Sequence, residues 1–311
     1  MRNTPSLQNW LTRLEVLSPT TAGKLQVFGL RHPSPSPLAY VTLDEALNSK
    51  LLEITEVDGG GNVPTLKLSN KSDSMVFLMA GEELVGAKQN RIPNVSIMVA
   101  AGSELPIPVS CVEAGRWRYT SRKFSSSGAG AHSKLRAKMA RKVKDSYRAA
   151  GQPLSDQREV WDEVASKLGK MGSHSASAAL HQVYEDHAKG LQDFVESVQA
   201  PDDCCGAVFA FGGHIAGIDV FDKPSTLSKL WPKVIRSYAI DALEEADGSP
   251  AVTPEHVKEW LQKAREAKTE KYDSPGVGDD VRFDSDALGG GSLLVEEQPV
   301  HTELFAATKG E

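Results

Sequence analysis

The sequence has little cysteine, and this scarcity excludes two classes of protein. Three cysteines occur among 311 residues. Cys204 and Cys205 are neighbours that would close a strained small ring if bridged, and Cys111 stands alone in a strand-like run. We therefore expect no disulfide framework. No Cys/His spacing resembles a zinc site, so we expect neither a metal centre nor another bound cofactor.

Long hydrophobic runs are also missing. The longest apolar runs, 75–80, 97–101 and 207–211, are far shorter than the roughly 18 residues that a membrane-spanning helix needs. Residues 1–17 form a polar amphipathic segment without the basic head and continuous apolar stretch of a secretory signal. The sequence thus predicts a cytoplasmic protein without a membrane partner.

Positive charge is not in excess. The chain has 35 Lys and Arg against 41 Asp and Glu, a net charge of −6, with 40 % hydrophobic residues. This composition is typical of a folded globular protein and argues against a nucleic acid as partner. The length predicts one large domain or two ordinary ones.

Short apolar runs alternate with turn residues over 25–117, which predicts an antiparallel sheet. Candidate strands are 25–30, 51–57, 65–68, 75–79, 95–100 and 105–112. Beyond them, Ser125–Ala131 has the composition of a flexible loop, and Pro232 is expected only near the first turn of its helix. The predicted fold class is α+β: a mainly antiparallel β-sandwich or open barrel with an inserted helical segment and C-terminal helices.

The domain organisation follows from these changes of pattern. We expect an N-terminal helical segment (1–24) and one main domain (25–246). The main domain would comprise a sheet (25–117), a helical insertion (132–199) and a hairpin with a helix (206–246). A C-terminal helix (253–271) and a partly flexible tail (272–311), whose strands could close the sheet, complete the prediction.

The most polar segment between apolar strands is Gly81–Arg91. Its candidate ligand-binding residues are Glu82, Glu83, Lys88, Gln89, Asn90 and Arg91. Carboxylates accept hydrogen bonds from hydroxyl groups, and an arginine offers a planar fork to a phosphate. The alternative is a solvated hairpin end whose opposite charges pair across the strands.

A basic segment, 116–148, contains eleven Lys and Arg side chains and only Asp145 opposes them. Its Ser/Gly stretch precedes a predicted helix that carries Arg136, and a helix N-terminus attracts phosphate. The stretch does not match the P-loop pattern. A solvated basic helix face paired with acidic neighbours is the competing interpretation. A weaker signal is the pair His181 and Glu185, one helical turn apart, for which a structural role is favoured over metal binding because no third ligand is evident.

Several segments together resemble a known bacterial family. These are 76–91, 107–117, 156–164, 217–222 and 230–239. They are similar to the ARPP domain, named for its association with ADP-ribosylglycohydrolases and rhodanese-phosphatases, and the resemblance spans 25–246. It implies a link to ADP-ribose or NAD metabolism, which is an association and not a mechanism.

Three functions compete at this point, and the sequence leaves open whether the protein is an enzyme. The first is a binding or accessory protein for a phosphorylated, nucleotide-like ligand. Its phosphate contacts would be Lys88, Arg91, Arg116 and Arg136, its hydroxyl or base contacts Glu83, Gln89, Asn90 and Glu113, with Glu82 and Trp117 also lining the site. The second is a hydrolase of an ADP-ribosyl or glycosidic bond that uses Glu83 and Glu113 as acid and base. The third is an interaction module whose basic helix binds a protein partner.

Overall fold

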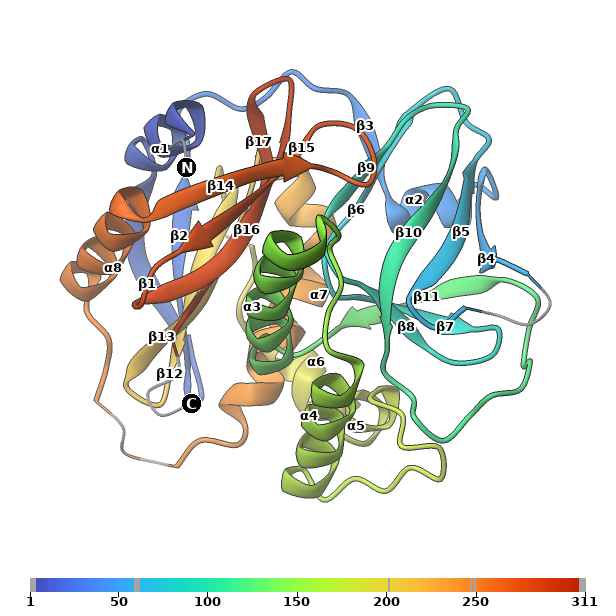
Figure 1. The fold of residues 1–311 in the computed structure, drawn as a ribbon. Coiled ribbons are helices and arrows are strands. Elements are labelled where there is room, and N and C mark those ends of the chain that lie inside the picture. Colours follow the sequence, from blue (N-terminus) through green and yellow to red (C-terminus); the bar gives the residue numbers. More distant parts are fainter. Residues whose placement is uncertain (1–3, 59–61, 201, 247, 249, 308–311) are drawn as a thin grey trace. The chain divides into compact units, whose positions relative to one another are not determined.

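The computed structural model describes residues 4–58, 62–200, 202–246, 248 and 250–307, and the chain divides into two compact units (Figure 1). Unit 1 comprises Met1–Pro37, Gly190–Asp273 and Gly278–Glu311. Unit 2 comprises Leu38–Lys189 and Ser274–Val277. Unit 1 is thus assembled from distant parts of the sequence, whereas unit 2 is almost continuous.

In the described ranges, unit 1 is built on an eight-stranded sheet, called here the large sheet, in which all neighbouring strands are antiparallel. In spatial order its strands are β1 (Glu15–Ala22), β2 (Leu25–Arg31), β12 (Gly206–Phe211), β13 (His214–Phe221), β17 (Gln298–Ala306), β16 (Leu288–Val295), β15 (Asp279–Asp284) and β14 (Lys268–Asp273). The N-terminal strands therefore pair with the hairpin 206–221, and the last strands continue the same sheet.

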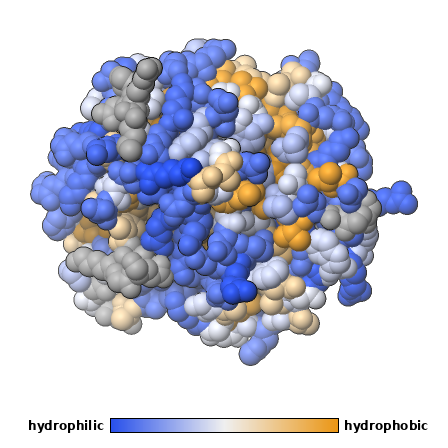
Figure 2. All heavy atoms as spheres, in the orientation of Figure 1, coloured by the Kyte–Doolittle hydropathy of each residue, from blue (hydrophilic) through white to orange (hydrophobic). Residues whose placement is uncertain are grey.

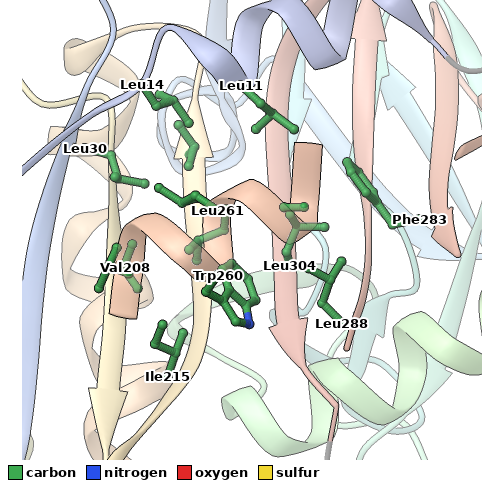
Figure 3. Close-up of a cluster of buried hydrophobic side chains, with 14 of the residues drawn as sticks. Leu11, Leu14, Leu30, Val208, Ile215, Trp260, Leu261, Phe283, Leu288 and Leu304 are labelled. Atoms are coloured by element: carbon green, nitrogen blue, oxygen red, sulfur yellow. The ribbon is translucent and has the colours of Figure 1, made fainter. Parts of the chain in front are cut away.

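Helices cover both faces of the large sheet. Helices α1 (Pro5–Thr12) and α8 (Pro254–Glu266) pack on one face, where Leu11, Leu261 and Val208 belong to one cluster of buried hydrophobic side chains (Figure 3). Successive strand residues point to opposite faces, and Phe209 accordingly stacks on Tyr238 of helix α7 (Pro224–Ala242), with 4.0 Å between ring centroids. The core of unit 1 lies on both sides of this sheet.

Pro232 lies inside α7 and not near its first turn, so the expectation for this residue was wrong. A proline in a helix interior removes one backbone hydrogen bond. Leu230, Trp231 and Val234 around it are buried, so packing compensates for that loss. Tertiary burial here overrides the local preference.

Unit 2 contains two sheets. The curled sheet has the order β11 (Phe124–Gly130), β7 (Glu82–Gly86), β8 (Arg91–Pro93), β10 (Glu104–Cys111), β5 (Thr65–Asn70) and β4 (Leu52–Glu56). Its first and last strands approach each other, and Lys123 Nζ lies 3.1 Å from Glu53 Oε2 between them. The curled sheet is therefore an open barrel.

A small sheet and several helices complete unit 2. The small sheet is formed by β3 (Tyr40–Thr42), β6 (Met75–Leu78) and β9 (Ile97–Val99), with β3 and β6 parallel. The helices are α2 (Leu43–Asn48), α3 (Ser133–Ala150), α4 (Gln157–Lys170) and α5 (His181–Asp186). Helix α6 (Ala188–Ser197) follows them in the chain.

The predicted α+β class with mainly antiparallel sheets is confirmed. Three local expectations differ from the structure. Ser125–Ala131 was expected to be a flexible loop, but Phe124–Gly130 is strand β11, paired with β7 because serine and glycine fit against a neighbouring backbone there. Residues 82–86 and 91–93, which were not among the candidate strands, are strands β7 and β8. Over residues 4–24, the described part of the predicted helical segment 1–24, only Pro5–Thr12 is helical, because Val16, Thr20 and Thr21 favour the strand β1 that follows.

Residues of the predicted tail lie in the large sheet as strands β15, β16 and β17. Segments from both sides of the predicted 25–246 domain thus contribute strands to one sheet. Within the described part of the chain, no helix is long and apolar enough to span a membrane.

Candidate functional site

The hairpin of β7 and β8 and the end of β10 position most of the candidate residues in unit 2. Arg91 pairs with Leu84 on one side and with Cys111 on the other. The hairpin loop and the strand end are tied together, since Asn90 N donates to Glu113 Oε2 (3.0 Å) and Val112 N donates to Asn90 O (3.0 Å). This local pairing assembles what we call the Arg91 cluster: Lys88, Gln89, Asn90, Arg91, Glu113, Arg116 and Trp117.

A buried ion pair anchors the Arg91 cluster. Arg116 donates from Nε to Glu113 Oε1 (2.8 Å) and from Nη2 to Glu113 Oε2 (2.6 Å). Ser177 Oγ adds a hydrogen bond to Glu113 Oε1 (2.7 Å). Burial by itself would raise the pKa of Glu113, but the hydrogen bonds from Arg116, Ser177 and Asn90 hold it below its ordinary value. Glu113 is therefore an ionised anchor with both oxygens engaged.

Arg91 has an unusual environment for a cation. Its side chain is 0 % exposed, and its Nη1 donates to the neutral Gln89 Oε1 at 2.9 Å. The buried Nε and Nη2 have no hydrogen-bond partner among the residues that the structure describes. The ring of Trp117 lies 5.7 Å from the guanidinium carbon. Buried arginines are normally paired with an anion, so two donors of Arg91 are available to one.

Two aromatic rings beside Lys88 are open to solvent. Trp117 is 48 % and Tyr119 is 49 % exposed. The ammonium group of Lys88 lies 5.0 Å from the Trp117 ring and 5.2 Å from the Tyr119 ring. Cation–π attraction of this kind holds a lysine near an aromatic surface. The cluster thus combines positive charge with exposed ring faces.

Glu83 has a partner that the sequence did not reveal. Its Oε2 lies 2.8 Å from His181 Nδ1, while its buried Oε1 has no hydrogen-bond partner among the described side chains and backbone groups. The hydrogen bond to Glu83 raises the pKa of His181, with further contributions from the charges of Glu185 and Glu113. His181 Nε2 is 3.6 Å from Glu185 Oε1. His181, which was paired with Glu185 on one helix face in the sequence analysis, therefore also contacts Glu83.

The structure places Glu82 and Arg136 apart from these contacts. Neighbouring residues of a strand point to opposite faces, and Glu82 Oε2 accepts a hydrogen bond from Met79 N (2.7 Å). Arg136 is buried on α3 with its aliphatic stem against Gly81. The neighbouring stretch that was expected as an anion-binding loop is strand β11.

The basic helix α3 is paired with the acidic side chains of α4. Lys138 Nζ lies 2.7 Å from Glu163 Oε2, and Lys142 Nζ lies 2.7 Å from Glu159 Oε1. For these two lysines, the structure agrees with the interpretation that the basic helix pairs with acidic neighbours.

Cys111 is an unsuitable nucleophile in this state. Burial raises the pKa of its thiol, and Sγ lies 3.3 Å from the backbone oxygen of Glu113. All three cysteines are free and buried. In the described residues, no group of three or more His, Cys, Asp or Glu side chains is arranged to hold a metal ion.

Two clefts open on unit 2. One, of about 690 Å³, lies between α2, β4 and β11 and is lined by Lys50, Lys123 and Ser125–Gly128. The other, of about 620 Å³, is lined by Glu56 and Tyr119 among others. In Figure 2, hydrophobic residues reach the surface on the right of the view, where Figure 1 draws the strands of unit 2.

Glu56 is the residue of the second cleft that sequence reasoning missed. It occupies a buried position of β4, in the phase of Leu52 and Ile54. A carboxylate at an inward position of an alternating strand is the signal that would have found it.

Comparison of the chain with protein families identifies the family to which it belongs. A model of the ARG and Rhodanese-Phosphatase-superfamily-associated Protein domain, ARPP-1, matches residues 13–305. No curated protein and no solved structure matches the chain. The match includes nearly all strands of both units and extends beyond the 25–246 range of the resemblance. The chain therefore belongs to the ARPP-1 family.

Proposed function

We propose that this protein is a cytoplasmic binding or accessory protein for a phosphorylated, nucleotide-like ligand, in ADP-ribose or NAD-linked metabolism. The observation that carries the proposal is the Arg91 guanidinium, which is wholly buried and whose Nε and Nη2 find no partner in the described part of the chain. An unsatisfied buried donor costs about 1–3 kcal/mol. An anionic ligand that accepts from both nitrogens would remove this cost and supply the missing negative charge.

The side chains around Arg91 suit a ligand that carries a phosphate and an aromatic ring. Lys88 adds a second positive charge, and the exposed faces of Trp117 and Tyr119 offer stacking surface. The ligand would reach Arg91 by displacing the indole of Trp117, which lies over the guanidinium and is half exposed. Exposed side chains change rotamer rapidly, so this displacement is not a large barrier.

The hydrolase alternative is less well supported, because Glu113 is poorly suited to act as a general acid. A general acid must carry a proton near the working pH, whereas Glu113 is held ionised by Arg116 and Ser177. The pair of Glu83 and His181 is the remaining arrangement with acid–base character. We therefore favour a binding function over a catalytic one.

Calorimetric titration with ADP-ribose, AMP and inorganic pyrophosphate tests the proposal on wild type and on Arg91→Met. Methionine fills much of the arginine volume without its charge. The loss of charge-assisted hydrogen bonds should weaken binding by about 1.5–3 kcal/mol, or roughly 10- to 150-fold. Because the charge of Arg91 is uncompensated, the ligand-free variant should be as stable as wild type.

Arg158→Met is the matched control, because Arg158 is exposed on α4. It should leave affinity unchanged. Absence of binding by the wild-type protein, or equal affinities of wild type and Arg91→Met, would refute the proposed function.

A further inference from the structure

The cleft of about 620 Å³ on unit 2 has an aromatic wall and a buried carboxylate. Tyr119 supplies the wall, and Glu56 lies among the lining residues together with Thr55 and Arg122. The Tyr119 ring also contacts the Lys88 ammonium group, which belongs to the Arg91 cluster. The cleft is thus next to the proposed phosphate contacts.

The two carboxylate oxygens of Glu56 differ in their hydrogen bonding. Its side chain lies at the inward end of β4, and the residue is 7 % exposed. Oε1 accepts a hydrogen bond from Lys88 N at 3.2 Å. Oε2 is buried and has no hydrogen-bond partner within the described ranges. An ionised carboxylate can only accept hydrogen bonds, so Oε2 is left as an acceptor for a donor in the cleft that Glu56 lines.

Hydroxyl groups of a sugar are the donors that fit this position. Carboxylates bind ribose hydroxyls in nucleotide sites by accepting their hydrogen bonds. A ring face as exposed as that of Tyr119 binds a base by stacking, which is insensitive to the identity of the base. We propose that Glu56 and Tyr119 form a nucleoside subsite, in which Glu56 accepts from the ribose diol and Tyr119 stacks on the base. This subsite rests on the proposed function, since it holds the nucleoside part of the ligand whose phosphate binds at Arg91.

The substitution Glu56→Gln tests the subsite with little risk to the fold. The amide oxygen of glutamine can still accept from Lys88 N, while its NH₂ group replaces the idle Oε2 and turns an acceptor into a donor. Glu53→Gln is the matched control: it is the same change on the same strand, at a side chain that pairs with Lys71 and Lys123 beside the other cleft.

The probes separate the two halves of the site. Adenosine carries the diol and no phosphate, 2′,3′-dideoxyadenosine lacks the diol, and inorganic pyrophosphate carries only the charge. Binding is measured by ligand-observed NMR for the nucleosides and by calorimetry for pyrophosphate. Glu56→Gln should weaken adenosine binding about tenfold or more, as expected for a hydrogen bond to a charged group. It should leave 2′,3′-dideoxyadenosine and pyrophosphate unaffected, and Glu53→Gln should change none of the three.

Each result has a distinct meaning. Equal adenosine affinity of wild type and Glu56→Gln, with pyrophosphate bound, overturns the subsite and leaves the proposed function standing. Adenosine binding that depends on Glu56, without any pyrophosphate binding, supports the subsite and overturns the phosphate site at Arg91. Failure of wild type to bind either probe overturns both.

Discussion

The anchor of the Arg91 cluster gives the sharpest stability prediction. In Glu113→Gln the carboxylate that accepts from Arg116, Ser177 and Asn90 loses its charge and one acceptor oxygen. Breaking a buried ion pair by removing one partner costs about 3–5 kcal/mol. Glutamine keeps one acceptor oxygen, so we expect the lower end, about 3 kcal/mol.

Urea unfolding followed by circular dichroism measures this loss, with Glu104→Gln as control. Glu104 begins the same strand that ends just before Glu113, and its ion pair with Lys67 (2.9 Å) is exposed. An exposed pair contributes under about 1 kcal/mol. The reasoning is refuted if the two variants unfold at the same urea concentration.

The pH dependence provides a second check on the same variant. The pKa of Glu113 is lowered in the folded state, so its contribution is complete above the unfolded value of 4.5 and is lost as pH falls through the lowered folded value. The difference in unfolding free energy between wild type and Glu113→Gln should therefore shrink as the pH falls below 4.5 and through the lowered pKa of Glu113 in the folded state. A difference that grows under acid would contradict the assignment of Glu113 as an ionised anchor.

Two further predictions concern unit 2. The pKa of His181 is raised by Glu83, so its stabilising contribution is complete below the unfolded value of 6.5 and is lost as pH rises through the raised folded value. Unfolding of wild type and His181→Gln from pH 5 to 9 should show a gap that narrows toward high pH, and a widening gap would contradict the pairing. Gly86→Ala should destabilise by more than about 2 kcal/mol, because its φ is +125° and a Cβ would lie 2.8 Å from the Lys123 backbone oxygen. Gly102→Ala, at φ +62° with no atom within 4 Å, should cost only about 1–2 kcal/mol in the same urea titration.

Hydrophobic periodicity predicted the regular parts of the fold. The candidate strand 51–57 contains strand β4, and the predicted helical insertion 132–199 contains helix α3, whose buried side chains include Leu135, Met139 and Val143 at four-residue spacing. Strands β7 and β8 were not predicted, because the buried side chains there include charged ones. Periodicity detects apolar faces, and a buried Glu or Arg is invisible to it until its partner is known.

The candidate site was predictable where its residues are close in sequence. Residues 88–91 and 113–117 meet because the strands that carry them are neighbours in the curled sheet. The contact of His181 with Glu83 and the presence of Glu56 at the site were not predicted, because each arises from a tertiary contact with another element, α5 or β4. Arg136 was included because it lies near the N-terminus of the helix that follows the Ser/Gly stretch, and its burial against Gly81 follows from the packing of α3.

The order of strands in the large sheet has a consequence for synthesis on the ribosome. Strand β17 lies between β13 and β16, so the sheet remains in two separate parts until residues 298–306 have emerged. Unit 2 is encoded almost entirely by 38–189 and has all its strands available much earlier. Chains that grow from the N-terminus fold domain by domain as they emerge. We expect the nascent chain to carry a finished unit 2 while β1, β2, β12 and β13 still present an open edge at β13, which makes that edge the point where a stalled chain would recruit a chaperone or aggregate.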